Sequence, residues 1–342
     1  MLGKVTLTML LLFVFLAPAH GVENGIEIAG DPNAVAVNGA GGFLYSPRIV
    51  LTTAHNHILP HEINDIEVGL PGQPWTSNST KIHASKVFLA STFNNGNFRN
   101  GGNIFSRTDD FAVIVLDKPM KMNDNVKIAS QEQINKYKLD HEKVSMVGYG
   151  LQSSEMRIAS NNGQNSIDIY PKIIKSNFIT DNEAQTIFKV NMPSNAIFNM
   201  DAYFAQNLTT GTVCDNDSGS GWFVEQANIR YYIGAQSAGW GFPNCGKDGI
   251  WGASGTFAAV SAAYKFMDLI LEAEKYVEAN PYLEPTPTPT PMPTLTSTPT
   301  NTTDLSKSKI SVGKTLKCVK GKSVKVIKSV NPKCPKGYLV GK

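Results

Sequence analysis

The chain has 342 residues, of which 42% are hydrophobic and 17% charged, and its net charge is +3. This is the composition of an ordinary soluble protein, and the length leaves room for a sizeable core in one or two globular units. After the first 21 residues no segment is apolar enough to span a bilayer, which excludes a protein built from several spanning helices.

The N-terminus, MLGKVTLTMLLLFVFLAPAHG, predicts a secretory signal peptide over residues 1–21. A positive charge at Lys4 precedes an apolar run over residues 7–16, and the small residues Ala17 and Ala19 follow it. The run is short for a membrane span and ends in a pattern typical of signal-peptidase cleavage. A short membrane anchor is the alternative. We therefore expect a secreted, extracellular protein.

Short apolar runs separated by turn residues make up the next part of the chain. Their length and their content of Val, Ile, Phe and Tyr favour strands over helices. The runs cover residues 41–54, 84–92, 110–119, 142–150, 186–192 and 231–239. Residues 261–280 alone show helical spacing, with Phe266, Ile270, Ala273 and Val277 recurring at intervals of four, three and four. These patterns predict an all-β unit, a barrel or a sandwich, closed by one C-terminal helix.

The end of the chain differs sharply in composition from the rest. Residues 281–304 form a Pro/Thr-rich linker that we expect to be extended and semi-rigid. Residues 305–342 contain eleven Lys and no acidic residue. Removing these positive charges from the net +3 leaves −8 for the preceding residues, so the mild overall charge conceals a basic tail. The tail is too short for a large core, and a disulfide is its natural staple.

The four cysteines lie in two groups, Cys214 and Cys245 in the β-rich part and Cys318 and Cys334 in the tail. Export favours the oxidation of thiols, and pairing within each group is the most economical of the three possible pairings. A zinc site is the alternative, although the chain has no Cys-x-x-Cys and no His beside either pair. We expect two disulfides, no metal and no cofactor.

Three short motifs carry residue types that nucleophilic catalysis uses. His55 ends the strand-like run IVLTTAH, Asp110 precedes the apolar run FAVIVL, and Ser218 lies among turn-forming residues in CDNDSGSGWF. Each is by itself an ordinary feature: a histidine at a strand end, a solvated acid at a strand start, or a surface turn. Their order along the chain carries the signal.

Together these motifs resemble those of the chymotrypsin-like (trypsin-like) serine peptidases. The family's TAAHC, DIALLKL and CxGDSGGP correspond to residues 52–56, 110–116 and 214–221. Further segments match in the same order, beginning at Gly41, at residues 148–150, in the strand before Cys245, at residues 254–260 and in the C-terminal helix. The resemblance covers residues 22–280. It implies two six-stranded antiparallel β-barrels with a C-terminal helix, and the linker and the basic tail come after this domain.

The resemblance implies a role for each matched residue. His55 is expected to be the general base, Asp110 to orient it and stabilise its imidazolium, and Ser218 to be the nucleophile. Asp110 is favoured over Asp109 because it directly precedes the apolar run. Ser237 is expected to hydrogen-bond Asp110 from behind. The implied activity is peptide-bond hydrolysis through an acyl-enzyme.

The family also uses a free N-terminus, which pairs with the aspartate before the nucleophile. That aspartate is Asp217 here, and the segment from Val22 best matches the start of the mature family members. Cleavage after Gly21 would create this terminus directly. Cleavage after Ala19 with later trimming is the alternative.

The resemblance assigns the primary specificity pocket to three residues. Thr212, six residues before the nucleophile, is the expected floor and carries no charge, while Gly239 and Gly255 are the expected walls. An open, neutral pocket predicts cleavage after apolar or medium-sized residues. The predicted Cys214–Cys245 disulfide would tie the nucleophile loop to the pocket wall.

Besides the uncharged Thr212, two departures separate the chain from the family. Asn216 stands where the family has a glycine whose N–H forms the oxyanion hole together with that of Ser218. Glycine accepts backbone angles forbidden to most residues, and Asn is among the next most tolerant. The cysteine pair around the histidine is missing, with Phe43 and Asn56 at or near its positions. An inactive peptidase fold, used as a binding module on a wall-associated stalk, is therefore the alternative to an active enzyme.

The expected partners follow from these features. We expect peptide or protein substrates and a monomeric enzyme. The lysines of residues 305–342 suit an acidic cell-wall or membrane surface, with a passive solubilising tail as the alternative. Nucleic acid is not an expected partner, because the tail has little aromatic interleaving beyond Tyr338.

Overall fold

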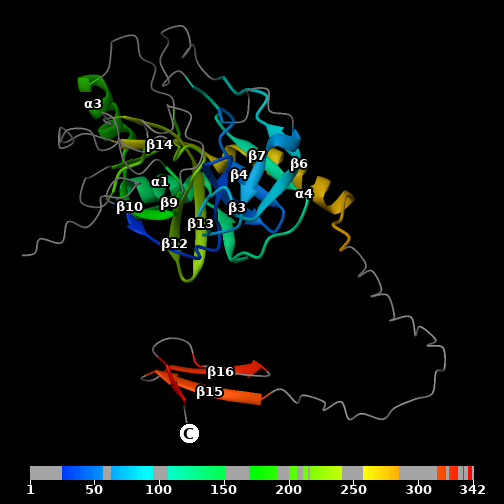
Figure 1. The fold of residues 1–342 in the computed structure, drawn as a ribbon. Coiled ribbons are helices and arrows are strands. Elements are labelled where there is room, and N and C mark those ends of the chain that lie inside the picture. The colour runs from blue at the N-terminus through cyan, green and yellow to red at the C-terminus, as the bar shows by residue number, and fades with distance from the viewer. Residues whose placement is uncertain are drawn as a thin grey trace, which may run out of the picture. The chain divides into compact units, whose positions relative to one another are not determined.

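The chain forms two compact units in the computed structural model, residues 1–284 and residues 285–342. Strands account for more of the described first unit than helices do, and its helices lie on the outside (Figure 1). The structure describes residues 25–56, 63–94, 107–150, 169–191, 200–205, 211–214, 216–240, 257–284, 314–320, 323–329, 334 and 338–340.

The first barrel is built from six short strands in the order β2-β3-β4-β7-β6-β5. These strands are β2 (Ala34–Val37), β3 (Ala40–Ser46), β4 (Ile49–Thr52), β5 (Glu67–Gly69), β6 (Lys81–Leu89) and β7 (Ala112–Leu116). Every neighbouring pair is antiparallel, and β2 pairs with β5 to close the ring. One cluster of buried apolar side chains draws on all six strands and fills the barrel.

Strand β7 shows why the sequence of some strands is apolar at every position. Ile114 and Leu116 belong to the cluster inside the barrel, whereas Val113 and Val115 belong to a second cluster that includes the C-terminal helix α4 (Met267–Ala279). Successive side chains of a strand point to opposite faces, so β7 is covered by apolar atoms on both. All five of its residues are buried.

The second barrel follows the order β10-β11-β14-β13-β12-β9, and the pairing of β9 with β10 closes it. Its strands are β9 (Lys143–Gly148), β10 (Lys172–Ile179), β11 (Ala202–Ala205), β12 (Gly221–Gln226), β13 (Ile229–Trp240) and β14 (Phe257–Ala262). Two short strands extend this sheet: β1 (Ile26–Glu27) pairs with β10, and β8 (Val126–Ile128) runs parallel to β13. The predicted all-β fold of two six-stranded antiparallel barrels is confirmed.

Aromatic side chains join the two barrels. Phe43 of β3 packs against Tyr232 of β13 and Phe223 of β12, with ring centroids 4.7 and 6.2 Å apart. Close approach of β12 requires Gly221, because a Cβ there would lie 2.6 Å from the Phe43 ring. Phe43 lies at or near a position where the family has a disulfide-bonded cysteine. In this chain, that region is filled by apolar packing between the two barrels instead of a disulfide.

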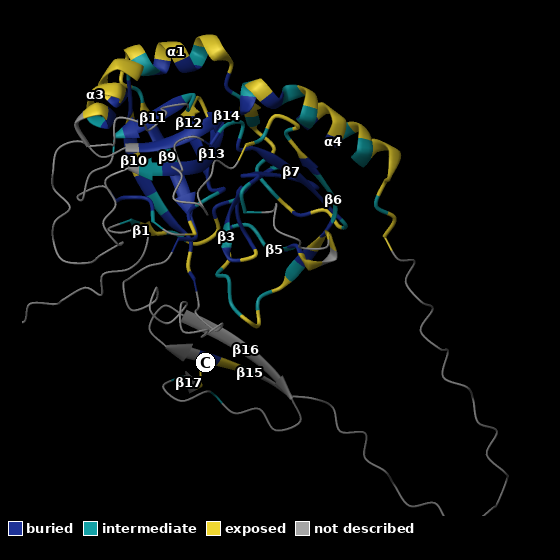
Figure 2. Ribbon diagram, turned by 90° about the horizontal axis from the view of Figure 1, so that it is seen from above, coloured by how far each residue is buried: buried dark blue, intermediate teal, exposed yellow. Residues whose placement is uncertain are grey.

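The helices lie on the outside of the first unit, with their outer faces exposed (Figure 2). Helix α4 follows the 3-10 turn η4 (Ala263–Phe266) and packs Ile270 and Ala273 into the same cluster as β7, as the helical spacing predicts. A second 3-10 turn, η1 (Ile63–Asp65), lies in the first barrel. Among the described helices, none is long and apolar enough to cross a membrane.

Helices α1 (Gln131–Leu139) and α3 (Asp181–Asn191) differ from the sequence expectation. The prediction of a strand over residues 186–192 is wrong, because most of that run forms the second half of α3. Its N-terminus is set by Thr180, whose hydroxyl accepts from the Glu183 N–H while the Glu183 carboxylate accepts from the Thr180 N–H. Phe188 then packs in a cluster with residues of β11 and β14.

The second unit contains a three-stranded sheet in the order β16-β15-β17. Its strands are β15 (Lys314–Lys320), β16 (Ser323–Ser329) and β17 (Leu339–Val340). Cys318 is fully buried and forms a disulfide with Cys334 across a Cα–Cα distance of 5.6 Å. The predicted disulfide of the tail is confirmed.

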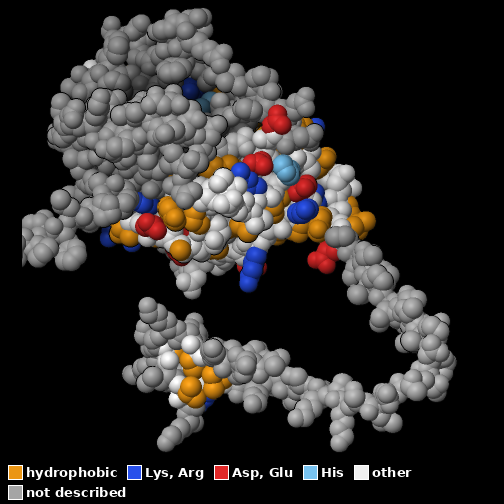
Figure 3. Space-filling view, viewed as in Figure 1, with side chains coloured by type: hydrophobic (Ala, Val, Ile, Leu, Met, Phe, Trp, Pro, Cys, Tyr) orange, Lys and Arg blue, Asp and Glu red, His pale blue; other side chains and the backbone are white. Residues whose placement is uncertain are grey.

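On the first unit, basic and acidic side chains are mixed over the described surface that Figure 3 presents.

Candidate active site

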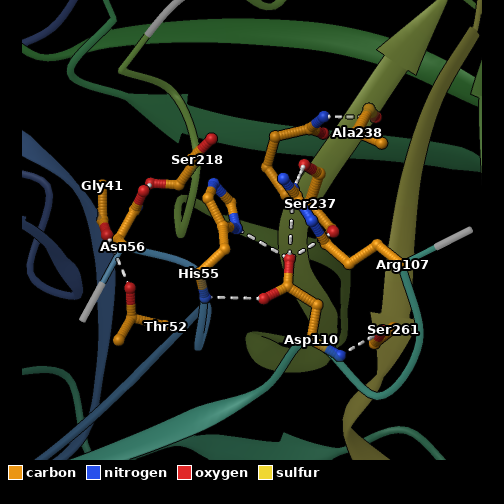
Figure 4. Close-up of polar contacts among 11 residues, drawn as sticks. Gly41, Thr52, His55, Asn56, Arg107, Asp110, Ser218, Ser237, Ala238 and Ser261 are labelled. Carbon is orange, nitrogen blue, oxygen red and sulfur yellow. Dashed lines mark hydrogen bonds and ion pairs between the residues drawn. The ribbon is translucent and has the colours of Figure 1, made fainter. Parts of the chain in front are cut away.

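His55 and Asp110 meet because of the register between two strands. β4 and β7 are antiparallel, and Thr52 at the end of β4 pairs with Ala112 at the start of β7. His55 follows Thr52 by three residues and Asp110 precedes Ala112 by two, so both lie at the same edge of the first barrel. Figure 4 shows their side chains facing each other.

Asp110 binds His55 with both carboxylate oxygens. The His55 Nδ1 atom lies 2.8 Å from Asp110 Oδ2, and the His55 backbone N–H donates to Oδ1 over 2.9 Å. The Asp110 side chain is fully buried, whereas the imidazole is 15% exposed. With the carboxylate accepting at Nδ1, the other ring nitrogen, Nε2, is left to exchange a proton with a neighbour.

Further groups surround the Asp110 carboxylate. Ser237 donates its hydroxyl to Oδ2, and the Arg107 guanidinium lies 3.6 Å from the same oxygen. Ser237 sits where β13 shifts register between Gln236 and Ala238, and such bulges redirect side chains. Burial alone would raise the pKa of Asp110, but attraction to His55 and Arg107 and the hydrogen bonds outweigh it, so the pKa lies below its usual range.

The neighbouring acid, Asp109, points elsewhere. Its backbone has a left-handed φ of 51°, and its carboxylate binds Lys265 over 3.2 Å. Asp109 therefore does not contact the His55 ring, which agrees with the prediction that Asp110 is the partner of His55.

Ser218 lies in a loop that both barrels hold by its backbone. The Ser218 carbonyl accepts from the Gly41 N–H at 2.9 Å and from the Asn56 side-chain amide at 3.0 Å. Gly219 has a φ of 89°, and a Cβ there would lie 2.2 Å from both the Gly41 carbonyl and the Thr52 hydroxyl. Only glycine fits this contact, so the loop is pressed closely against the end of the first barrel.

These contacts place Ser218 beside the His55 ring (Figure 4). In the drawn cluster no hydrogen bond joins the Ser218 hydroxyl to the imidazole. Catalytic hydrogen bonds are often loose before substrate binds, so this geometry is compatible with proton transfer. The structure thus brings together His55, Asp110, Ser218 and Ser237 from four separate parts of the sequence.

The loop also presents two backbone N–H groups. Asn216 has a φ of 71°, the left-handed conformation for which the family uses glycine. Within the described part of the chain, neither the Asn216 N–H nor the Ser218 N–H is donated to a protein acceptor. The Asn at this position therefore adopts a glycine-like φ and leaves both donors available.

Asp217 is fully buried between these two residues. Its carboxylate accepts from the Gly150 N–H at 2.8 Å and from the Cys214 N–H at 2.7 Å. Its predicted partner, the amino group of Val22, lies outside the described residues.

The predicted pocket is described in part. Thr212 is buried, and its hydroxyl has no hydrogen-bond partner among the residues that the structure describes. Gly239 lies in β13, whereas Gly255 and Cys245 lie outside the described residues. Cys214 is disulfide-bonded, and because its predicted partner Cys245 lies outside the described residues, the pairing stays a prediction. Within those ranges, no cluster of His, Cys, Asp and Glu is arranged to hold a metal ion.

Sequence reasoning missed two neighbours of this site. Arg107 carries no motif that marks it as a partner of Asp110. Asn56 was recognised only as a replacement for a family cysteine, although its amide reaches Ser218, 162 residues further along the chain. The short motif around each residue holds no sign of these contacts.

The two closed barrels, with this site at their junction, have the fold of a serine peptidase. A family model described as Trypsin matches residues 31–267, more than half of the chain. The chain therefore belongs to the Trypsin family. No curated protein matches it significantly.

Proposed function

We propose that this protein is a serine endopeptidase that uses Ser218, His55 and Asp110. The observation that carries the proposal is the buried Asp110 carboxylate, which binds both the Nδ1 atom and the backbone N–H of His55 beside Ser218. An acid that fixes the tautomer of a histidine next to a serine is the arrangement that activates a hydroxyl nucleophile.

The proposed reaction proceeds in two halves. His55 Nε2 accepts the Ser218 hydroxyl proton as Oγ attacks the peptide carbonyl, and the imidazolium formed is stabilised by ionised Asp110. The same Nε2 then protonates the leaving amine, which leaves an acyl-enzyme. A water molecule, deprotonated by His55, hydrolyses that ester and restores Ser218.

The negative charge that develops on the carbonyl oxygen needs donors. The N–H groups of Asn216 and Ser218, which have no acceptor among the described residues, are the proposed oxyanion hole, and their availability favours an active enzyme over a binding module of the same fold. The uncharged Thr212 at the floor position supports cleavage after apolar or neutral, medium-sized residues.

A peptide-library cleavage profile tests this function and its specificity together. Full-length secreted protein is compared with Ser218→Ala, which removes only the nucleophilic oxygen. We expect cleavage by the wild type after neutral residues and none by the variant. Cleavage that persists in Ser218→Ala would assign the activity elsewhere, and cleavage restricted to Arg and Lys would refute the proposed pocket.

The mature N-terminus is part of the proposal. We propose that the chain is secreted and that cleavage after Gly21 frees Val22 to pair with the buried Asp217. N-terminal sequencing of the secreted protein should return Val22. His20 as the stable first residue would contradict direct maturation by signal peptidase.

For the basic tail we propose attachment to an acidic cell surface. The support is its charge, eleven Lys without an acid, on a compact sheet with its own disulfide. Full-length protein should be retained on cells at low salt and released by high salt. Equal retention of a form lacking residues 305–342 would show that the tail is passive.

A further inference from the structure

A buried arginine lies next to the acid of the proposed triad. Arg107 precedes Asp110 by three residues, and its side chain is 9% exposed. Its Nη1 atom lies 3.6 Å from Asp110 Oδ2 and donates to the Ser237 carbonyl at 3.0 Å. Figure 4 shows Arg107 and His55 on opposite sides of the Asp110 carboxylate.

Packing alone does not account for a guanidinium at position 107, because an apolar side chain would fill the same space without the cost of desolvation. Burial lowers the pKa of Arg107 while Asp110 opposes that shift, and a guanidinium stays protonated in proteins. Its Nε atom has no hydrogen-bond partner among the described residues, so part of the desolvation cost is not recovered. A well-packed apolar side chain of similar volume often stabilises a fold as well as a buried ion pair does.

The electrostatic consequence follows from the shared carboxylate. The negative charge of Asp110 stabilises the protonated form of His55, and a cation on the far side of Asp110 opposes that effect. We propose that Arg107 is a positioning residue of the site, which holds Asp110 by an ion pair and offsets part of its charge. An imidazolium at His55 is then stabilised less by the carboxylate than it would be by Asp110 alone. This inference rests on the proposed function.

Two other charged groups of the described site region have partners of their own. Lys265 of η4 binds both Asp109, before β7, and Asp201, before β11, over 3.2 and 3.3 Å. On the nucleophile loop, Asp217 accepts from two backbone N–H groups. The proposed effect therefore belongs to the cation that contacts Asp110 directly.

The test is the pH dependence of kcat/KM in three variants. Arg107→Met and Arg107→Gln have similar length without the charge, and Arg107→Lys keeps the charge. The acid limb of kcat/KM reports protonation of the base in the free enzyme. We expect the acid limb to move to higher pH by about one unit in the Met and Gln variants, which lowers kcat/KM about tenfold on the acid side. The plateau value of kcat/KM should stay within about threefold of that of the wild type. The Lys variant should keep its limb near that of the wild type.

Lys265→Met is the matched control, because it removes a neighbouring cation that binds Asp109 instead of Asp110. Its acid limb should stay in place. A limb that does not move in folded Met and Gln variants would overturn the proposal, even if their melting temperatures fall, since a purely structural residue affects stability alone. Failure of all three Arg107 variants to fold, Lys included, would also overturn it. A wild type that cleaves no peptide would refute the proposed function, and this inference with it.

Discussion

The two barrels hold their parts of the candidate site in different ways. In the first barrel, His55 and Asp110 are joined by hydrogen bonds that involve both carboxylate oxygens. In the second, the loop of Ser218 is held through its backbone, with a left-handed φ at Asn216 and Gly219. The first half thus depends on side-chain chemistry and the second on backbone shape. Substitutions in the two halves should therefore fail for different reasons.

The largest effect is expected when the negative charge of Asp110 is removed from the first-barrel part of the site. Asp110→Asn should lower kcat by about 10⁴-fold, because the amide favours the wrong tautomer of His55 and does not stabilise its imidazolium. Peptide hydrolysis at a fixed pH measures it. Asp109→Asn is the control, and its kcat should stay within about twofold. Equal losses in both variants would mean that the acid has been misassigned.

Backbone shape is tested next, at Asn216. Asn216→Val should lower kcat by about 10²–10³-fold, because a β-branched residue is strongly disfavoured at φ 71° and the oxyanion donor would turn away. Asn216→Gly should retain full activity, because glycine adopts this φ without strain. Steady-state kinetics of both variants decide the matter. Activity in the Val variant equal to that of the wild type would remove Asn216 from the oxyanion hole.

The contact between the two halves can be weakened on its own. Asn56→Ala leaves the Ser218 carbonyl with the Gly41 N–H as its remaining donor, and we expect kcat to fall about tenfold with little change in KM. Asn56→Asp, which is isosteric but lacks the donor, should lose more. A loss confined to KM in both variants would place Asn56 in substrate binding instead of nucleophile positioning.

The smallest expected effect concerns the stability of the second barrel. Lys172 of β10 is 1% exposed, and burial, opposed by Glu27, lowers its pKa to about 8. The unfolded chain binds this proton more tightly, so folding becomes more favourable as pH rises from about 8 to 10.5. Lys172→Met should therefore raise the melting temperature by about 2–4 °C at pH 6, and by less at pH 10. An equal gain at both pH values would show that the proton is not involved.

Much of the fold was predictable because its signals are local. The apolar run that becomes β7 and the spacing that becomes α4 are both visible in the sequence. The polar helix α1 was missed, although Ser130 and Gln133 form a capping box at its start. α3 was taken for a strand because Ile187 and Phe188 are strand-like, whereas the cap formed by Thr180 and Glu183 decides the conformation.

The site divides in the same way. His55, Asp110 and Ser218 lie in short motifs whose order is informative, so sequence reasoning found them before their contacts were visible. Arg107 and the amide of Asn56 act on residues that are close only after the barrels form. A burial-dependent ion pair and a contact between barrels leave no periodicity or spacing in the sequence, so only the structure reveals them.

The most direct test of the central claim is covalent labelling of Ser218 by a fluorophosphonate. Processed full-length protein is treated with the probe at neutral pH, and the modified peptide is identified by mass spectrometry, with Ser218→Ala as the control. A working site predicts stoichiometric labelling at Ser218 and none in the variant. Absence of labelling in correctly processed protein would contradict the proposed enzyme and favour a binding module on the same fold.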